Sequence, residues 1–144
     1  MKDADILARV DRSGGEDACW PWTGAIDQGG YGKVLYNGRT LGAHRVVHMI
    51  LVGPIPDGLE LDHTCHNNSD CDGGNACPHR RCCNPRHAEA VTPRENTLRG
   101  RTIAARHAAK THCPQGHPYD EANTYRWNGW RICRTCRSSR RAVA

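Results

Sequence analysis

Nine cysteines and nine histidines in a chain of 144 residues constrain the fold more than any other feature of the sequence. Only 38% of the residues are apolar, phenylalanine is absent, and the 15 glycines and 8 prolines leave few positions for a large hydrophobic core. The first twelve residues carry three aspartates where a secretory signal has an apolar stretch, so we expect a chain that is not exported. Disulfides are rare in such proteins, and metal ligation is therefore the better explanation for the cysteines.

A membrane-spanning segment is not expected. The longest apolar stretch, residues 46–55, is interrupted by His48 and Gly53. It is also much shorter than the roughly 20 apolar residues that a membrane helix needs.

The charge is unevenly distributed along the chain. Residues 1–93 carry a net charge of −3, whereas residues 94–144 carry +8. A strongly basic end predicts a polyanionic partner, most simply nucleic acid, although a solvated basic tail is the alternative. The side chains that we expect to contact phosphates are Arg45, Arg99, Arg101, Arg106, Lys110, Arg134 and Arg137.

Local patterns predict short elements of both kinds. In chain order these are a helix over 5–10, strands over 31–36 and 39–41, a helix over 43–51, strands over 59–62 and 88–91, and a helix after residue 92. Asn37-Gly38 is a strong hairpin signal between the first two strands. Thr92, Pro93 and Glu95 form the pattern of a capping box at the start of the last helix.

The C-terminal residues contain the clearest metal-binding pattern. Two ligand pairs, Cys113-x3-His117 and Cys133-x2-Cys136, are separated by fifteen residues that can form a hairpin through Asn128-Gly129. Zinc binds four nitrogen and sulfur ligands in a tetrahedron, and such closed sites are structural. We therefore expect one structural zinc ion here.

The loop over 64–86 offers more ligands than one ion needs: Cys65, His66, Cys71, Cys77, His79, Cys82 and Cys83. A second structural zinc ion is expected, because the loop has few apolar residues to fix it. Adjacent residues seldom both reach one ion, so one of Cys82 and Cys83 is expected to pack instead. The favoured ligand set is Cys65, Cys71, Cys77 and Cys82, with His79 as a substitute.

A different group of residues surrounds this loop. Asp62 and Asn96 offer oxygen ligands, which suit Mg²⁺ or Mn²⁺ better than zinc, and His63 is a candidate base beside them. Taken alone, His63 could equally be a zinc ligand together with Cys65.

Several motifs in this order resemble the HNH (His-Me finger, ββα-metal) endonucleases, especially the homing-endonuclease-like group of bacteriophages. They are Cys19-Trp20-x-Trp22-x-Gly24, Gly30-Tyr31-Gly32, Ala43-His44-Arg45, Leu61-Asp62-His63-x-Cys65, Cys82-Cys83-Asn84-Pro85-Arg86-His87 and Val91-Thr92-Pro93-Arg94-Glu95-Asn96-x-x-Arg99-Gly100. The resemblance covers residues 17–101, and it implies a small zinc-stabilised α+β fold of the ββα-metal type.

The resemblance also implies roles for individual residues. His63 would be the general base that activates water, and Asp62 and Asn96 would hold one Mg²⁺ or Mn²⁺ ion. Asn84 and His87 would be scaffold groups that orient the loop or His63, and which of them matches the family's middle asparagine is left open. Neighbouring strand residues point to opposite faces, so the resemblance implies that the chain turns at Asp62-His63.

The expected organisation has four parts. Residues 1–58 form a hairpin and helix region, 59–101 the HNH core with the cysteine-rich loop, 102–111 a basic connector and 112–144 the zinc module with its basic tail. The expected function is metal-dependent cleavage of double-stranded DNA in the cytoplasm of a bacterium that carries a phage or prophage. A homodimer and phage packaging proteins are further candidate partners. The alternatives are a non-enzymatic zinc-containing DNA-binding adaptor or regulator, and a nuclease that acts on RNA.

Overall fold

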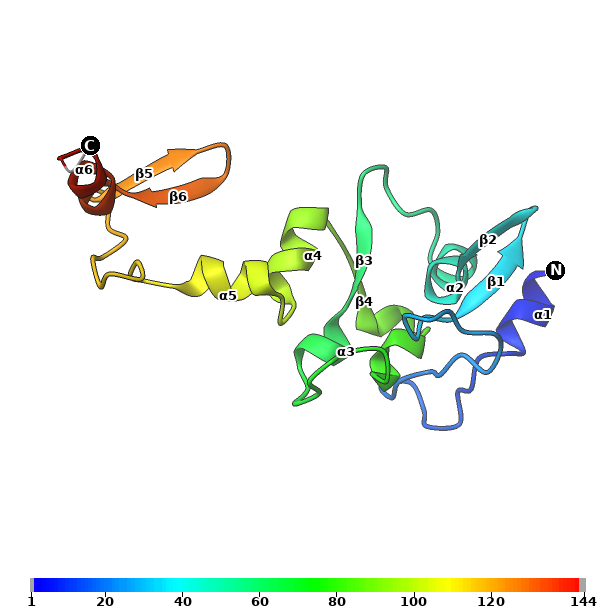
Figure 1. Ribbon diagram of the computed structural model, residues 1–144. Helices are drawn as coiled ribbons and strands as arrows, with labels where there is room; N and C mark the ends of the chain where they lie inside the picture. The colour runs from blue at the N-terminus through cyan, green and yellow to red at the C-terminus, as the bar shows by residue number, and fades with distance from the viewer. Residues whose placement is uncertain (1, 143–144) are drawn as a thin grey trace. The chain divides into compact units, whose positions relative to one another are not determined.

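The computed structural model describes residues 2–142, with side chains as far as Arg140. It contains short helices and three antiparallel strand pairs, β1–β2, β3–β4 and β5–β6, which confirms the predicted α+β class (Figure 1). The chain divides into two compact units, the first ending at Arg101 and the second starting at Thr102. The expected connector over 102–111 therefore lies in the second unit.

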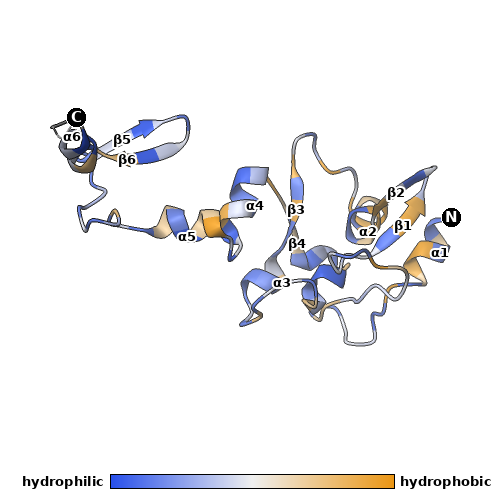
Figure 2. Ribbon diagram, in the orientation of Figure 1, coloured by the Kyte–Doolittle hydropathy of each residue, from blue (hydrophilic) through white to orange (hydrophobic). Residues whose placement is uncertain are grey.

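The core of the first unit lies between α1 (Asp3–Leu7), β1 (Lys33–Tyr36) and α2 (Ala43–Leu51). Apolar residues gather in these three elements (Figure 2). Trp22 belongs to this core and is only 2% exposed. A Cβ atom on Gly32 would lie 2.7 Å from the Trp22 ring and 3.0 Å from Ala43, so this position has room only for glycine.

The first hairpin forms at the predicted place. β1 pairs with β2 (Arg39–Gly42), with Tyr36 opposite Arg39. Asn37 and Gly38 make the turn with φ angles of 48° and 77°, the left-handed conformation that a two-residue hairpin loop needs. The following helix has the predicted bounds, Ala43–Leu51.

A second hairpin and a helix follow in the order strand, loop, strand, helix. β3 (Glu60–His63) pairs with β4 (Ala88–Val91), with His63 opposite Ala88, and α4 (Pro93–Arg99) comes next. The capping box is present: the Thr92 side chain accepts from the Glu95 N–H, and the Glu95 carboxylate accepts from the Thr92 N–H. Together these elements form a ββα unit.

Three short helices lie in the cysteine-rich loop, where the sequence predicted no regular structure. They are α3 (Thr64–Asn67) and two 3₁₀ turns, η1 (Pro78–Arg81) and η2 (Pro85–His87). Each of the 3₁₀ turns starts with a proline, whose fixed φ suits a first helical position. These short helical turns fix the backbone of the loop and therefore the directions of its cysteine and histidine side chains.

The second unit begins with α5 (Ile103–Ala109), which the sequence analysis treated only as connector. Thr102 caps this helix by accepting from the Ala105 N–H. The predicted hairpin follows as β5 (Thr124–Trp127) and β6 (Trp130–Cys133), turning at Asn128-Gly129, and α6 (Arg134–Ala142) ends the unit. Within residues 2–142, no helix has both the length and the apolar character needed to cross a bilayer.

Candidate active site and metal clusters

His63 stands at the end of β3, where its imidazole meets the cysteine-rich loop. Its Nε2 atom lies 3.1 Å from the carbonyl oxygen of Cys82. Because a carbonyl oxygen only accepts, this contact places the proton on Nε2 and leaves Nδ1 with its lone pair. Burial lowers the pKa of His63 below its usual 6.5, so the ring is neutral near pH 7. A neutral imidazole with a fixed tautomer is a suitable proton acceptor.

Two other rings surround His63. The His44 ring centroid lies 4.8 Å from that of His63, and the Tyr31 centroid lies 6.3 Å from it. Burial, and then the neighbouring His63, lower the pKa of His44 to about 3, so this ring stays uncharged. The Nδ1 atom of His44 is buried and makes no hydrogen bond within the described part of the chain.

Asp62 and Asn96 lie where β3 meets α4. Asp62 is buried, and its Oδ2 accepts a 2.7 Å hydrogen bond from Asn67 and lies 3.6 Å from Nη1 of Arg99. Asn96 donates from Nδ2 to Oε2 of Glu60 at 2.7 Å. The carboxylate and amide oxygens of these residues have the chemistry that Mg²⁺ or Mn²⁺ requires, and Glu60 adds a carboxylate that the sequence analysis did not single out.

The backbone stays regular through Asp62 and His63. Asp62 is paired with Glu89 and His63 with Ala88 in an unbroken antiparallel register. The chain turns only after His63, where α3 starts at Thr64. The two side chains therefore leave the strand end from opposite faces, and the turn implied at Asp62-His63 comes one residue later.

Three groups of cysteine and histidine side chains could each hold a metal ion, and the ligand atoms within each group all lie within 4.8 Å of one another. All nine cysteines are free thiols in this structure. One group is the predicted C-terminal set of Cys113, His117, Cys133 and Cys136. The Cys113 and Cys136 sulfurs are 3.7 Å apart, and Nδ1 of His117 lies 3.3 Å from the Cys136 sulfur.

The predicted grouping of Cys65, Cys71, Cys77 and Cys82 around one ion is wrong, because the structure divides these residues between two clusters. Cys71 and Cys77 lie with His66 and His79, which we call the His66 cluster. In it, the Cys77 sulfur lies 3.6 Å from that of Cys71 and 3.5 Å from Nδ1 of His66. His79 therefore lies in the same cluster as Cys71 and Cys77, and not with Cys65 and Cys82.

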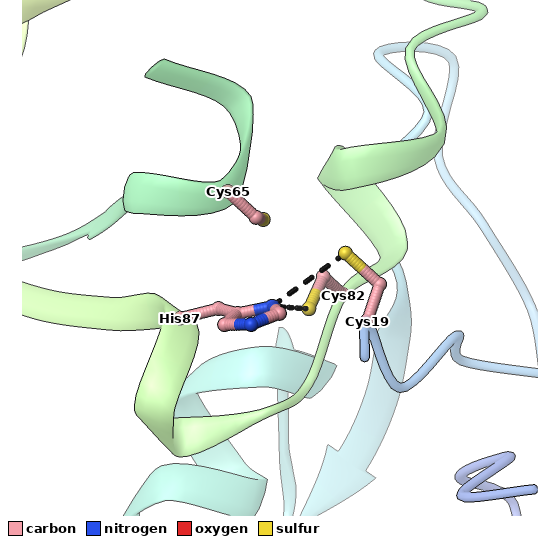
Figure 3. A group of neighbouring side chains, drawn as sticks. All are labelled: Cys19, Cys65, Cys82 and His87. Atoms are coloured by element: carbon pink, nitrogen blue, oxygen red, sulfur yellow. Dashed lines mark hydrogen bonds between the residues drawn. The ribbon is translucent and has the colours of Figure 1, made fainter. Parts of the chain in front are cut away.

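Cys65 and Cys82 lie with Cys19 and His87, and we call this group the Cys19 cluster (Figure 3). His87, which was expected to orient the loop or His63, is a member of this cluster, and its Nδ1 lies 3.6 Å from the sulfurs of both Cys19 and Cys82. His63 belongs to none of the three clusters found within residues 2–142, which argues against the alternative of His63 as a zinc ligand. Cys83 packs in the hydrophobic core.

Cys19 was not among the expected ligands, although it lies in the Cys-Trp-x-Trp motif of the sequence. Asn84 is the side chain that brings this segment to the loop. It is 1% exposed, and its Nδ2 donates to the carbonyl oxygens of Glu16 and Ala18 at 2.8 and 2.7 Å. Asn84 therefore links the segment before Cys19 to the end of the cysteine-rich loop.

The predicted phosphate contacts differ in their surroundings. Arg99 is paired with Glu89 and Asp62, and Arg101 donates to the Ser69 carbonyl and lies beside Asp72, so these two are engaged within the protein. In the second unit, Arg134 and Arg137 lie over the Tyr125 ring, with guanidinium carbons 5.9 and 5.2 Å from its centroid. Arg106 and Lys110 are exposed, and Arg45 is half-buried on α2.

A family model described as HNH endonuclease matches residues 41–75, a stretch that contains α2, β3 and α3. The matched residues include His44, Asp62 and His63. Residues 41–75 of this chain are therefore similar to the HNH endonucleases. The match ends before α4, so it does not itself include Asn96.

The chain has curated relatives among phage proteins. The chain is 32% identical over 79 residues to "Protein 7.7" of Escherichia phage T7, covering 55% of this chain and 52% of that protein. It is 33% identical over 94 residues to "Protein 2.8" of the same phage, covering 64% and 54%. An "Uncharacterized gene 5.3 protein" of Enterobacteria phage T3 matches at 36% over 56 residues. The chain spans about half the length of these relatives, and no solved structure matches it significantly.

Proposed function

We propose that this protein is a divalent-metal-dependent endonuclease that hydrolyses phosphodiester bonds of double-stranded DNA, by nicking or by cutting both strands. The single observation that carries the proposal is the His63 imidazole, held neutral with its Nε2 on the Cys82 carbonyl inside the segment that matches the HNH family. A binding protein has no need of a fixed, uncharged imidazole beside a set of oxygen ligands.

In the proposed reaction, Nδ1 of His63 accepts the proton of the attacking water. The Cys82 carbonyl keeps the other ring nitrogen protonated, so the ring presents the correct atom without rearranging. Tyr31 and His44 pack around the ring and limit its exchange with solvent. Since burial penalises a charged imidazole, the proton must pass on to solvent before the next turnover.

Asp62 and Asn96 are the proposed ligands of one Mg²⁺ or Mn²⁺ ion. Such an ion, when bound, would offset the negative charge that develops on the phosphate and on the leaving oxygen. Arg99 and Asn67, which now hold the Asp62 carboxylate, keep this side chain in place at the end of β3. Because His63 leaves the strand from the other face, the phosphate is expected to approach the strand end, where both side chains can reach it.

The basic residues would extend the contact with DNA. Arg45, Arg106 and Lys110 are the side chains best placed for phosphate contacts, because Arg99 and Arg101 already have acidic neighbours. Arg134 and Arg137 would contribute from the second unit. Two zinc ions are proposed, one in the C-terminal cluster and one in the His66 cluster. The C-terminal ion would fix the start of α6, which carries Arg134 and Arg137. The proposed setting is the cytoplasm of a phage-infected or prophage-carrying bacterium, since the curated relatives are phage proteins.

One observation favours a second candidate, a zinc-containing DNA-binding adaptor without activity. Oδ2 of Asp62 accepts from Asn67 and lies beside Arg99, so one proposed ligand of the catalytic ion is already engaged within the protein. For an adaptor, DNA binding would be independent of Mg²⁺ and Mn²⁺.

Conversion of supercoiled plasmid separates the two candidates. The zinc-loaded protein, freed of other metals by gel filtration, is incubated with plasmid at low salt, with and without Mg²⁺ or Mn²⁺. The nuclease proposal predicts open-circular or linear product only when one of these ions is present. Salt-sensitive DNA binding with no product, on plasmid and on phage genomic DNA alike, would favour the adaptor.

A further inference from the structure

The Cys19 cluster has the dimensions of an occupied metal site. Nδ1 of His87 lies 3.6 Å from the Cys19 sulfur and 3.6 Å from the Cys82 sulfur, and Cys65 completes the group (Figure 3). With Zn–S bonds of about 2.3 Å and Zn–N bonds of about 2.0–2.1 Å, a tetrahedral site has ligand-to-ligand distances of about 3.5–3.8 Å. A disulfide would need sulfurs about 2.05 Å apart, and every cysteine here is a free thiol.

The His87 ring is oriented as metal-bound histidines are. Its Nε2 atom lies 3.0 Å from the carbonyl oxygen of Asp17. That carbonyl can only accept, so Nε2 carries the proton and the lone pair of Nδ1 points at the sulfurs. A backbone carbonyl on the far nitrogen is a common second partner of a histidine ligand.

The backbone around the cluster is fixed independently of any ion. Asn84 holds the carbonyls of Glu16 and Ala18, and the Cys83 N–H donates to the Trp20 carbonyl at 2.8 Å. Arg86 forms ion pairs with Glu16 and Asp17. These contacts align the segment before Trp20 with the segment around Cys82, so that ligands far apart in sequence meet.

We propose that Cys19, Cys65, Cys82 and His87 bind a third zinc ion, separate from the ions of the His66 cluster and the C-terminal cluster. Three thiolates and one imidazole favour zinc over Mg²⁺ or Mn²⁺, and four protein ligands make a closed, structural site. The ion joins the N-terminal segment to both ends of the cysteine-rich loop. Eight of the nine cysteines are then ligands, and only Cys83 is not.

This site also positions the proposed base, a consequence that rests on the proposed nuclease function. Cys82 contributes its sulfur to the cluster and its carbonyl oxygen to Nε2 of His63. Zinc at the sulfur would fix the Cys82 backbone and therefore the direction in which that carbonyl points. Cys82 is in this sense a positioning residue that acts through His63.

Metal content of the full-length protein is the first test, and it does not depend on cleavage. The protein purified with zinc should hold three zinc ions per chain by elemental analysis. The Cys19→Ser/Cys65→Ser double variant should hold two, whereas the Cys83→Ala variant, which removes a buried thiol outside the clusters, should hold three. Two zinc ions in the wild type, or three in the double variant, would overturn the proposal.

Cadmium substitution tests the ligand sets in the wild-type protein, so that a variant that misfolds does not decide the outcome. The ¹¹³Cd NMR spectrum should contain two resonances in the region of three-thiolate, one-imidazole sites and one in the region of two-thiolate, two-imidazole sites. A four-thiolate resonance, or a single three-thiolate resonance, would contradict the Cys19 cluster. A protein with all three resonances that cleaves no DNA would leave the zinc site standing and overturn only the nuclease function.

Discussion

Nε2 of His63 lies 3.1 Å from the carbonyl oxygen of Cys82, and the sulfur of the same Cys82 lies 3.6 Å from Nδ1 of His87. One residue therefore connects the proposed base to a candidate zinc site. The peptide carbonyl fixes the tautomer of His63, and the proposed zinc ion at the sulfur would fix the position of the peptide.

The rate of cleavage should depend on pH through His63. Burial lowers the pKa of this imidazole below 6.5, and the base is active only when it is unprotonated. Activity should therefore persist as the pH falls to 6.5 and decline about tenfold per pH unit only below the lowered pKa. The pH dependence is measured from initial rates of cleavage between pH 5 and 8, with the zinc content checked at each pH. A decline that begins above pH 7 would contradict the assignment.

Removal of the Asp62 carboxylate should abolish the response to Mg²⁺. The Asp62→Asn variant keeps the shape of the side chain but loses the negative charge that binds the ion. Losing several kcal/mol of charge stabilisation in the transition state lowers the rate about 100-fold or more. The matched control is Asp72→Asn, which changes an exposed carboxylate beside Arg101. Equal Mg²⁺ titration curves for the wild type and Asp62→Asn would exclude Asp62 as a ligand.

The capping box at Thr92 should contribute measurably to stability. Thr92→Ala removes the oxygen that accepts from the Glu95 N–H, and loss of such a cap costs about 1 kcal/mol. For a unit of about 100 residues, this lowers Tm by about 4–8 °C. Thr92→Ser keeps the hydroxyl and should restore most of the loss in a calorimetric scan. An unchanged Tm in Thr92→Ala would mean that α4 is held in place by other contacts.

DNA affinity should become less salt-dependent when exposed cations of the second unit are removed. Each phosphate contact contributes about 0.9 to the slope of log K against log salt concentration. Arg106→Ala and Lys110→Ala should each reduce the slope by about that amount. Arg86→Ala is the control, because Arg86 is already paired with Glu16 and Asp17. The slope is measured by fluorescence anisotropy from 50 to 200 mM salt. Identical slopes for all variants would show that α5 does not contact DNA.

Short sequence patterns correctly predicted the hairpin turns and the start of α4, because residues close together in the sequence determine these features. Asn37-Gly38 and Asn128-Gly129 adopt the left-handed φ angles of tight hairpins, and Thr92 with Glu95 starts α4 where the capping pattern indicated. These features depend on interactions within a few residues of each other, which a sequence pattern contains.

The division of the ligands between clusters could not be predicted in the same way. Cys65 and His66 are adjacent, but in α3 successive side chains point about 100° apart, so they enter different clusters. The sequence showed no regular period there, and the choice between the clusters depended on that single helical turn. Cys19 is brought to Cys65 by long-range contacts, such as those of Asn84 with the carbonyls of Glu16 and Ala18, 68 and 66 positions away.

The most direct test of the central claim is the initial rate of plasmid nicking by His63→Ala, compared with wild type and with His107→Ala, an exposed histidine of α5. All three proteins should have equal zinc content, so that a folding defect is not mistaken for lost chemistry. His63→Ala should be at least about 100-fold slower than the wild type in Mg²⁺, whereas His107→Ala should equal the wild type. Equal rates for His63→Ala and the wild type would contradict His63 as the base.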